Sequence, residues 1–212
     1  MYKFEMTQVL DERFLTRLVE KFRAREVRLY DKLDRYYNVK NDGILNRSMK
    51  HGKPNNKLCH GFARYITNMA TSYYAGKPVE YIIEDDEYKA CLEDYLDDQY
   101  NFDYEISKAA SKKGIAFELM YINEKSELKT KKYEAQDIIP IYSSRQDEFL
   151  NGFVRIYESR DLDGNLLCDY ADVYDKTDIY QFTRRTKASQ YELVDIKPHL
   201  LSDVPLIVYW NN

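Results

Sequence analysis

Apolar side chains recur every three or four positions between residues 10 and 38, the spacing that places them on one face of a helix. The recurrence slips out of phase over residues 23–26. The pattern therefore predicts a helix in two pieces, with a bend or break at that point. The first apolar stripe is Phe14, Leu18 and Phe22, and the second is Val27, Tyr30, Leu33 and Tyr37.

A second helical pattern lies between Pro54 and Pro78. Asn55 or Asn56 could cap its first turn, and Gly76 could adopt the left-handed conformation that often ends a helix. The spacing of the large apolar residues predicts that one face of this helix is buried. The predicted buried face is Leu58, Phe62, Tyr65, Ile66, Met69 and Tyr73.

The segments around this helix are predicted from their polarity and turn residues. Residues 38–53 are polar and contain Asn-Asp-Gly and His-Gly turn signals, which indicate a mobile loop. Residues 79–83 are predicted as a short strand. An acidic helix is expected over residues 85–99 and another over residues 102–113, where Gly114 stops it. The expected buried face of the acidic helix is Tyr88, Leu92, Tyr95 and Leu96.

The second half of the chain has the alternation of strands. Turns are expected over residues 123–126 and at Asp163-Gly164-Asn165. Helices followed by hairpin-linked strands indicate an α+β fold with a mainly antiparallel sheet packed with helices. We expect an N-terminal helical arm and loop over residues 1–53 and one α+β domain over residues 54–212. The predicted strands are 115–122, 127–133, 138–142, 152–159, 166–174, 178–183, 191–194 and 206–209.

The composition is compatible with one substantial core or two small ones, since the chain has 212 residues of which 44% are hydrophobic. The sequence has no apolar run of membrane-spanning length, and its N-terminus lacks an apolar stretch of signal-peptide length. We therefore expect a cytosolic product without membrane contact. Cys59, Cys91 and Cys168 lie far apart, which argues against a disulfide framework.

Charge is distributed unevenly along the chain. The net charge is −4, but residues 1–78 carry 16 Lys and Arg against 8 Asp and Glu, and residues 79–109 carry 2 against 11. The total is too acidic for a dedicated nucleic-acid binder. The split indicates either solvated helix faces, which is the more ordinary explanation, or contacts between neighbouring copies.

Few residue patterns point to a cofactor or a metal. The sequence has no glycine-rich nucleotide-binding loop. Residues 161–165 have the carboxylate-glycine composition of a calcium loop but lack the later ligands, so a hairpin turn is favoured. Adjacent Cys59 and His60 diverge on a helix, and His51 and His199 have no sequence partner for acid–base work. We therefore expect no cofactor and no metal.

The sharpest enzymatic alternative is a metal-dependent nuclease. Glu127 and Lys129 have the spacing that places a carboxylate and a cation on one side of a strand. Glu118, or Asp97 and Asp98, could add oxygen ligands. Against this, the pattern has only two fixed residues, and charged hairpin strands are normally solvent-exposed.

Several segments resemble a known family when they are taken in order along the chain. The segment around residue 65 contains the short sequence motifs GKPNN, FARYI, MA and GKPVEY. It is preceded by YDKLDRYYNVKNDGILNR and followed by ISKAASKKGIAFELMYINEKSELK, DIIPIYSS, FVRIYE, VYDKTDIYQF and DVPLIVYWNN. Together these resemble the portal proteins of tailed bacteriophages, in the branch typical of long-tailed phages of Gram-positive hosts. One departure is Asn38-Val39, where the family usually has a glycine.

The resemblance implies a structural role without covalent chemistry. It implies a homo-oligomeric ring of about twelve subunits at one capsid vertex. This ring would pass double-stranded DNA and would contact terminase, capsid and scaffolding proteins and head-tail connectors. Portal subunits of this group continue past the position of Trp210 to build the stem, clip and crown. The resemblance therefore covers the outer wing portion, and motor docking and DNA passage are expected of the whole family protein.

The charge split suggests which residues would meet across such a ring. We expect the basic side chains of the first helix to face the acidic helix of a neighbouring subunit. The basic residues are Arg23, Arg25, Arg28 and Lys32, and the acidic ones are Asp85, Asp86, Glu93, Asp94 and Asp97. A heteromeric adaptor that binds another protein through its tyrosine-rich surface is the alternative, and it would stay monomeric without its partner.

Overall fold

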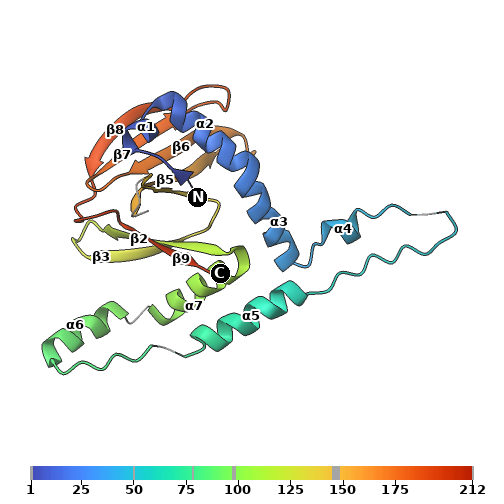
Figure 1. Cartoon of the computed structure of the whole chain (residues 1–212), viewed down its shortest axis with the longest axis horizontal. Coiled ribbons are helices and arrows are strands. Elements are labelled where there is room, and N and C mark those ends of the chain that lie inside the picture. Colours follow the sequence, from blue (N-terminus) through green and yellow to red (C-terminus); the bar gives the residue numbers. More distant parts are fainter. Residues whose placement is uncertain (1, 50, 78, 97–98, 145–148, 212) are drawn as a thin grey trace. The chain divides into compact units, whose positions relative to one another are not determined.

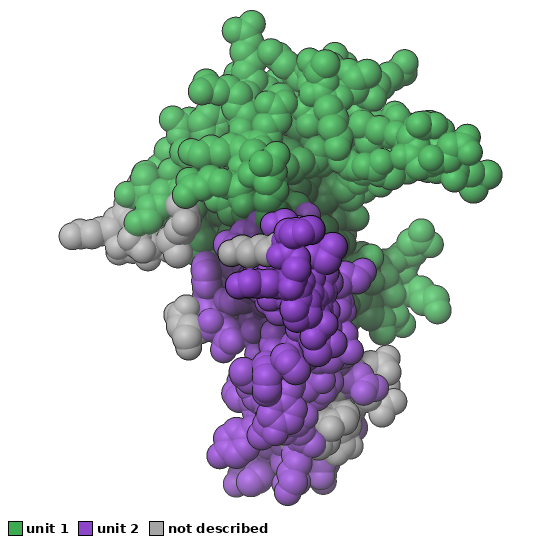
Figure 2. Space-filling view, turned by 90° about the vertical axis from the view of Figure 1, so that its right-hand side faces the viewer, with its two compact units in different colours: residues 1–28, 117–207 green, residues 29–116, 208–212 purple. Residues whose placement is uncertain are grey.

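The chain folds into two compact units in the computed structural model. The structure describes residues 2–49, 51–77, 79–96, 99–144 and 149–211. Unit 1 comprises Met1–Arg28 and Phe117–Ile207, and unit 2 comprises Leu29–Ala116 and Val208–Asn212 (Figure 2). This division differs from the expected boundary at residue 53, because the chain leaves unit 1 near Arg28 and returns at Phe117.

Unit 1 is built on a six-stranded sheet with the order β1-β4-β5-β6-β7-β8 (Figure 1). Strand β1 pairs with β4 in parallel, and the remaining neighbours pair antiparallel. These strands are linked mostly by short turns, which is why consecutive strands lie side by side. The strands are β1 (Tyr2–Lys3), β4 (Ile138–Tyr142), β5 (Leu150–Arg160), β6 (Leu166–Tyr174), β7 (Asp178–Arg184) and β8 (Glu192–Pro198).

Helices α1 (Met6–Val9) and α2 (Glu12–Phe22) lie against one face of this sheet (Figure 1). The Asp11 carboxylate caps α2 by accepting a hydrogen bond from the Phe14 amide at 2.8 Å. The Thr16 hydroxyl accepts a hydrogen bond from the Tyr191 amide at 3.0 Å and so ties α2 to the start of β8. The apolar side of α2 is buried, as its spacing predicts. Its buried apolar residues are Leu15, Leu18, Val19 and Phe22.

The predicted phase slip is a π-helical turn, η1 (Arg23–Val27), between α2 and α3 (Arg28–Tyr37). A π turn adds one residue to a helical repeat. Phe22 and Val27, which end one apolar stripe and begin the next, are five positions apart, the step of such a turn. The prediction of a helix interrupted over residues 23–26 is therefore confirmed.

Aromatic pairs across strands stabilise the sheet of unit 1. Phe153 stacks on Tyr174, its register partner, with ring centroids 4.3 Å apart. Tyr157 stacks on Tyr170 in the same way at 4.7 Å. Gly152 makes room for a close approach, because a Cβ atom there would lie 2.4 Å from the Tyr174 carbonyl oxygen. Part of the unusual tyrosine content thus serves packing within one subunit.

Unit 2 is mainly helical. Tyr37 on α3 donates a hydrogen bond to the Asn68 side-chain oxygen on α5 (Phe62–Ala75) at 3.0 Å. Asp34 on α3 pairs with Lys112 and Lys113 on α7 (Gln99–Lys113). These polar contacts join α3, α5 and α7. The remaining helices of this unit are α4 (Asp42–Leu45), α5 (Phe62–Ala75), α6 (Asp86–Leu96) and α7 (Gln99–Lys113).

A second, three-stranded sheet has the order β3-β2-β9, formed by β2 (Ile115–Ile122), β3 (Leu128–Tyr133) and β9 (Leu206–Trp210). The boundary between the two units falls within β2 and β9. Gly114, with φ of +83°, ends α7 in the left-handed conformation before β2 begins. The observed helices and mixed sheets confirm the predicted α+β class.

The strand predictions are confirmed within a few residues, and those for β2, β4 and β6 match the observed bounds. The predicted strand over residues 79–83 is wrong, because these residues have no regular structure and pair with no strand in the described part of the chain. The expected loop over residues 38–53 contains the short helix α4. Strand β1 and helix α1 were not predicted, since two and four residues carry no periodic signal.

Candidate functional surfaces

A buried ion-pair network in unit 1 engages one of the residues predicted to face a neighbouring subunit. Arg23 on η1 donates two hydrogen bonds to the Asp169 carboxylate on β6, at 2.6 and 2.7 Å. Arg184 on β7 donates from Nε to the same carboxylate at 2.9 Å, and its guanidinium lies over the Tyr191 ring at 4.5 Å. The Asp169 side chain is 0% exposed and that of Arg184 is 1% exposed.

The arginines hold Asp169 in its charged form. Burial alone raises the pKa of the Asp169 carboxyl, but the hydrogen bonds from Arg23 and Arg184 outweigh burial, so the net pKa lies below its usual range. On the same strand the balance is reversed at Asp172. Burial raises the pKa of Asp172, and Arg155, 3.3 Å away, offsets this only in part.

Arg23 differs from the other three predicted basic residues in its ion pairing. Because Arg23 is paired with Asp169 and lies 3.6 Å from Glu158, its charge is used within the subunit. Arg25 and Arg28 are exposed and form no ion pair within the described residues. Lys32 is exposed too, and its ammonium lies over the Tyr36 ring at 5.5 Å. Carboxylates of its own chain thus already neutralise Arg23, and an intersubunit contact by any of the four basic residues remains a prediction.

The acidic residues predicted to face them are only partly described. Asp85 and Asp86 are exposed. The Asp85 carboxylate accepts hydrogen bonds from the amides of Glu87 and Tyr88 and so caps α6. The side chains of Glu93 and Asp94, and Asp97 as a whole, lie outside the described residues, as do those of Tyr95 and Leu96 from the predicted buried face. Tyr88, from that same face, is exposed.

The largest departure from expectation is the helix between Pro54 and Pro78. Helix α5 begins at Phe62 after Gly61, and Asn55 exchanges hydrogen bonds with Arg47 instead of capping the helix. Gly76 has φ of −77° and is not left-handed. The predicted buried face is exposed. Leu58 is exposed, and so are the five residues that we name the α5 outer face: Phe62, Tyr65, Ile66, Met69 and Tyr73.

The reason is that α5 packs through its small residues. Thr67, Thr71 and Ala75 recur every four positions and are buried. Helix α7 presents Ala109 and Ala110 in the core of unit 2. Small side chains allow two helix backbones to approach closely, so the large residues on the other side of α5 point away from α7. Spacing alone identified an apolar face correctly but could not choose which face meets the subunit's own core.

The residues that follow α5 form a second exposed apolar surface. Val79, Tyr81, Ile82 and Tyr88 are exposed, and Ile82 is 99% exposed. Acidic residues are interspersed among them at Glu80, Glu84 and Asp85 to Glu87. A hollow of about 340 Å³ adjoins the start of this segment. Among the residues that line the hollow are Tyr74, Val79, Asp103, Ile106 and Tyr209.

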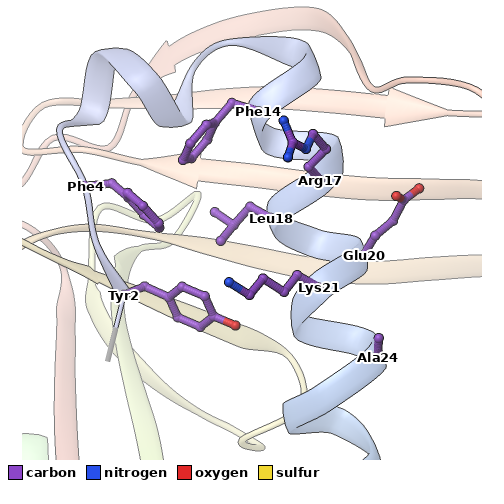
Figure 3. A pocket seen from close by; sticks show the side chains of 8 residues that line it. All are labelled: Tyr2, Phe4, Phe14, Arg17, Leu18, Glu20, Lys21 and Ala24. Carbon is purple, nitrogen blue, oxygen red and sulfur yellow. The ribbon is translucent and has the colours of Figure 1, made fainter.

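Unit 1 has a groove of its own beside the N-terminal strand. It has a volume of about 550 Å³, and Figure 3 shows Phe4 and Phe14 facing each other at one end. Their ring centroids are 4.9 Å apart. Arg17, Glu20 and Lys21 lie along α2 at its rim (Figure 3). Because the rim carries both signs of charge, the groove does not by itself select a class of ligand.

Those residues of the nuclease alternative that the structure describes do not converge on a metal site. Glu127 is exposed and accepts a hydrogen bond from the Asn123 side chain at 2.8 Å, and Lys129 lies 3.7 Å from it. Glu118 is buried on β2, where it is the register partner of Lys132. Asp97 and Asp98 lie outside the described residues. Within the described residues, no group of three or more His, Cys, Asp or Glu could hold a metal ion.

The remaining chemical candidates have local structural roles. Asp161 accepts hydrogen bonds from the amide and side chain of Asn165 at 2.7 and 2.9 Å, which confirms the hairpin turn and lowers the pKa of its carboxyl. His199 is buried, and its Nδ1 accepts a hydrogen bond from the Leu201 amide at 3.2 Å. His60 is exposed beside Phe62. His51 is exposed as well.

No helix in the described part of the chain combines the length and the apolar character needed to cross a bilayer.

Comparison with protein families gives a match over most of the chain. The model of the family described as "Phage portal protein, SPP1 Gp6-like" matches residues 19–212. This range includes nearly all of the segments on which the resemblance was based. A comparison with individually curated proteins found no match.

Proposed function

Because the chain belongs to the SPP1 Gp6-like family of phage portal proteins, we propose that it is a structural subunit of the portal ring at the capsid vertex. In this role the ring admits double-stranded DNA during packaging and releases it during ejection. The observation that carries the proposal is the family match over residues 19–212. The portal family implies an oligomeric ring with capsid and packaging partners.

The finer parts of the proposal concern ring size and partners. The ring has about twelve copies, closed by heterologous contacts between identical subunits. It docks terminase and head-tail connectors and contacts capsid and scaffolding proteins during assembly in the host cytoplasm. DNA passes by non-specific phosphate contacts, which are weak enough to allow movement and depend on salt. The role requires no cofactor.

Charge complementarity supports one intersubunit contact within such a ring. The exposed cations Arg25, Arg28 and Lys32 of one subunit face the acidic helix of the next, at Asp85, Asp86, Glu93, Asp94 and Asp97. Arg23 is omitted because Asp169 of its own chain neutralises it. Reversing Arg25 and Arg28 to glutamate should weaken ring assembly, and the effect should shrink at high salt. Unchanged assembly would remove this contact from the proposal.

The direct test of the role is to localise the protein in particles. Antibodies raised against the chain should label a single vertex of each virion, where head meets tail. Quantitative mass spectrometry should give about twelve copies per particle if the ring closes as proposed. Labelling spread over the whole capsid, or absent from it, would contradict the proposal.

A heteromeric adaptor remains the second candidate, favoured by the exposed α5 outer face, which an unrelated protein could also cover. The two candidates differ in self-association. An adaptor stays monomeric until its partner is added, whereas a portal subunit associates with further copies of itself.

A further inference from the structure

The α5 outer face is larger than the apolar patches that monomers usually expose. Its five side chains are each between 55% and 95% exposed. Taking roughly 200 Å² for a fully exposed large side chain, they present on the order of 700 Å². The largest patch on a typical monomer is about 300–600 Å², and larger ones mark interaction sites.

Helix α5 buries a side of small residues and exposes large apolar residues on the opposite side. Thr67, Thr71 and Ala75 face the core of unit 2, while Ile66 and Tyr73 belong to the other side. A wide apolar face on a helix normally packs against another surface. Among the described residues, only the side with small residues is covered, and the other side is free to meet a second surface.

The charge around α5 restricts what that surface can be. The sequence has no acidic residue between Asp42 and Glu80, whereas Arg47, Lys57 and Arg64 are basic and exposed. A surface that combines apolar side chains with acidic ones would therefore complement the α5 outer face. The same chain carries such a surface in residues 79–88, which we name the acidic segment.

The acidic segment matches the α5 outer face in three respects. It exposes Val79, Tyr81, Ile82 and Tyr88, so it offers apolar area. It carries five carboxylates and no basic residue. The hollow at Val79 can receive large side chains.

We propose that the α5 outer face of one copy docks on the acidic segment of a second copy. The inference rests on the proposed function, since a ring brings identical copies together. The two surfaces are different, so the contact is heterologous and can be repeated from copy to copy, as ring closure requires. Roughly 700 Å² from α5 is close to the ~800 Å² per partner that a standard interface buries.

The test uses sedimentation velocity of the full chain over a range of concentrations. The wild-type protein should associate as its concentration rises. Ile66→Asp/Tyr73→Asp, which breaks the α5 outer face, should weaken association by at least about tenfold. Ile82→Asp/Tyr88→Asp, which breaks the acidic segment, should do the same. All four positions are exposed, so the folded subunit should tolerate the changes.

Leu162→Asp/Leu167→Asp is the matched control, because both leucines are exposed on unit 1, away from either surface in the sequence. This control should associate like the wild-type chain. The most discriminating experiment mixes Ile66→Asp/Tyr73→Asp with Ile82→Asp/Tyr88→Asp. Each variant retains one intact surface, so a heterologous contact predicts a one-to-one pair and nothing larger.

Contrary outcomes overturn the inference in distinguishable ways. Unchanged association of Ile66→Asp/Tyr73→Asp would exclude the α5 outer face. Loss of association in both variants without pairing in the mixture would mean that identical surfaces meet, which excludes the head-to-tail contact. A wild-type chain that stays monomeric at every concentration would exclude a second copy as the occupant. None of these results alters the vertex labelling, which tests the proposed function separately.

Discussion

The two units of this protein use their large apolar residues in opposite ways. In unit 1 the largest fully buried side chains include Tyr191, Phe117, Phe153 and Phe182. Among the described residues of unit 2 the buried hydrophobic ones are mostly alanines, with Ile106 and Ile115, while Phe62 and Tyr73 are exposed. Unit 1 therefore has the core of a self-sufficient domain.

Unit 2 has the composition of a domain but keeps much of its apolar area outside. Burial of apolar area is the main favourable term in folding, so unit 2 gains less from folding alone. Its helices are joined by small buried residues and by polar contacts such as Tyr37 to Asn68. The difference indicates that unit 1 buries its large apolar residues within itself, and our proposal is that unit 2 covers its own by association with a second copy.

Truncating one phenylalanine in each unit should expose this contrast most strongly. Phe153→Ala should destabilise unit 1 by about 3–5 kcal/mol, because it leaves a cavity in a closed core. Phe62→Ala should change the stability of unit 2 by no more than about 0.5 kcal/mol in the dilute protein. Hydrogen exchange with mass spectrometry reads the two units separately. Equal losses from both variants would contradict the contrast.

Removing the buried counter-charge should have the next largest effect. Asp169→Asn leaves Arg23 and Arg184 without their carboxylate and should cost unit 1 roughly 3 kcal/mol. Asp203→Asn is the control, since its pair with Lys176 is exposed and should contribute nothing measurable. Urea denaturation followed through exchange of β6 amides measures both. If Asp169→Asn left the free energy of unfolding unchanged, the network would not hold η1 to the sheet.

Overpacking the small face of α5 should cost less. Thr71→Leu inserts a larger side chain between α5 and α7 and should destabilise unit 2 by about 1–3 kcal/mol. Ser72→Leu, one position along and exposed, serves as the control. Faster amide exchange in α7 of the Thr71 variant alone is the expected readout. Similar exchange in both variants would mean that α7 does not pack on this face.

The smallest expected effect is a pH dependence confined to unit 1. The pKa of Asp169 is lowered in the folded protein, so its contribution is present above the pKa of the unfolded chain, about 3.9. That contribution is lost as the pH falls further, through the folded pKa. Asp172 has a raised pKa and opposes this trend, because its ionisation disfavours the folded state. Acid titration of Asp169→Asn should therefore show a shallower loss of stability than the wild type.

The elements predicted well were those whose signal is local. Strand β6 has alternating residues between two turns, and the π turn η1 appears as a break in the apolar spacing of one helix. The predictions that failed depended on partners far along the chain. Arg23 and Asp169 are separated by 146 positions in the sequence, so no local pattern reveals their pairing. The wrong buried face was predicted for α5 because α7 packs only against its small residues. The strand expected over residues 79–83 has no strand to pair with in the described part of the chain.

The central claim is that the α5 outer face is covered by another copy of the chain, and photo-crosslinking from Tyr73 tests it most directly. A benzoylphenylalanine at this position, which is 95% exposed in the single subunit, would be activated in a mixture of ¹⁴N- and ¹⁵N-labelled protein. The account predicts mixed-isotope crosslinks between position 73 and residues 79–88 of a second copy. Crosslinks confined to one chain, or between position 73 of both copies, would contradict it.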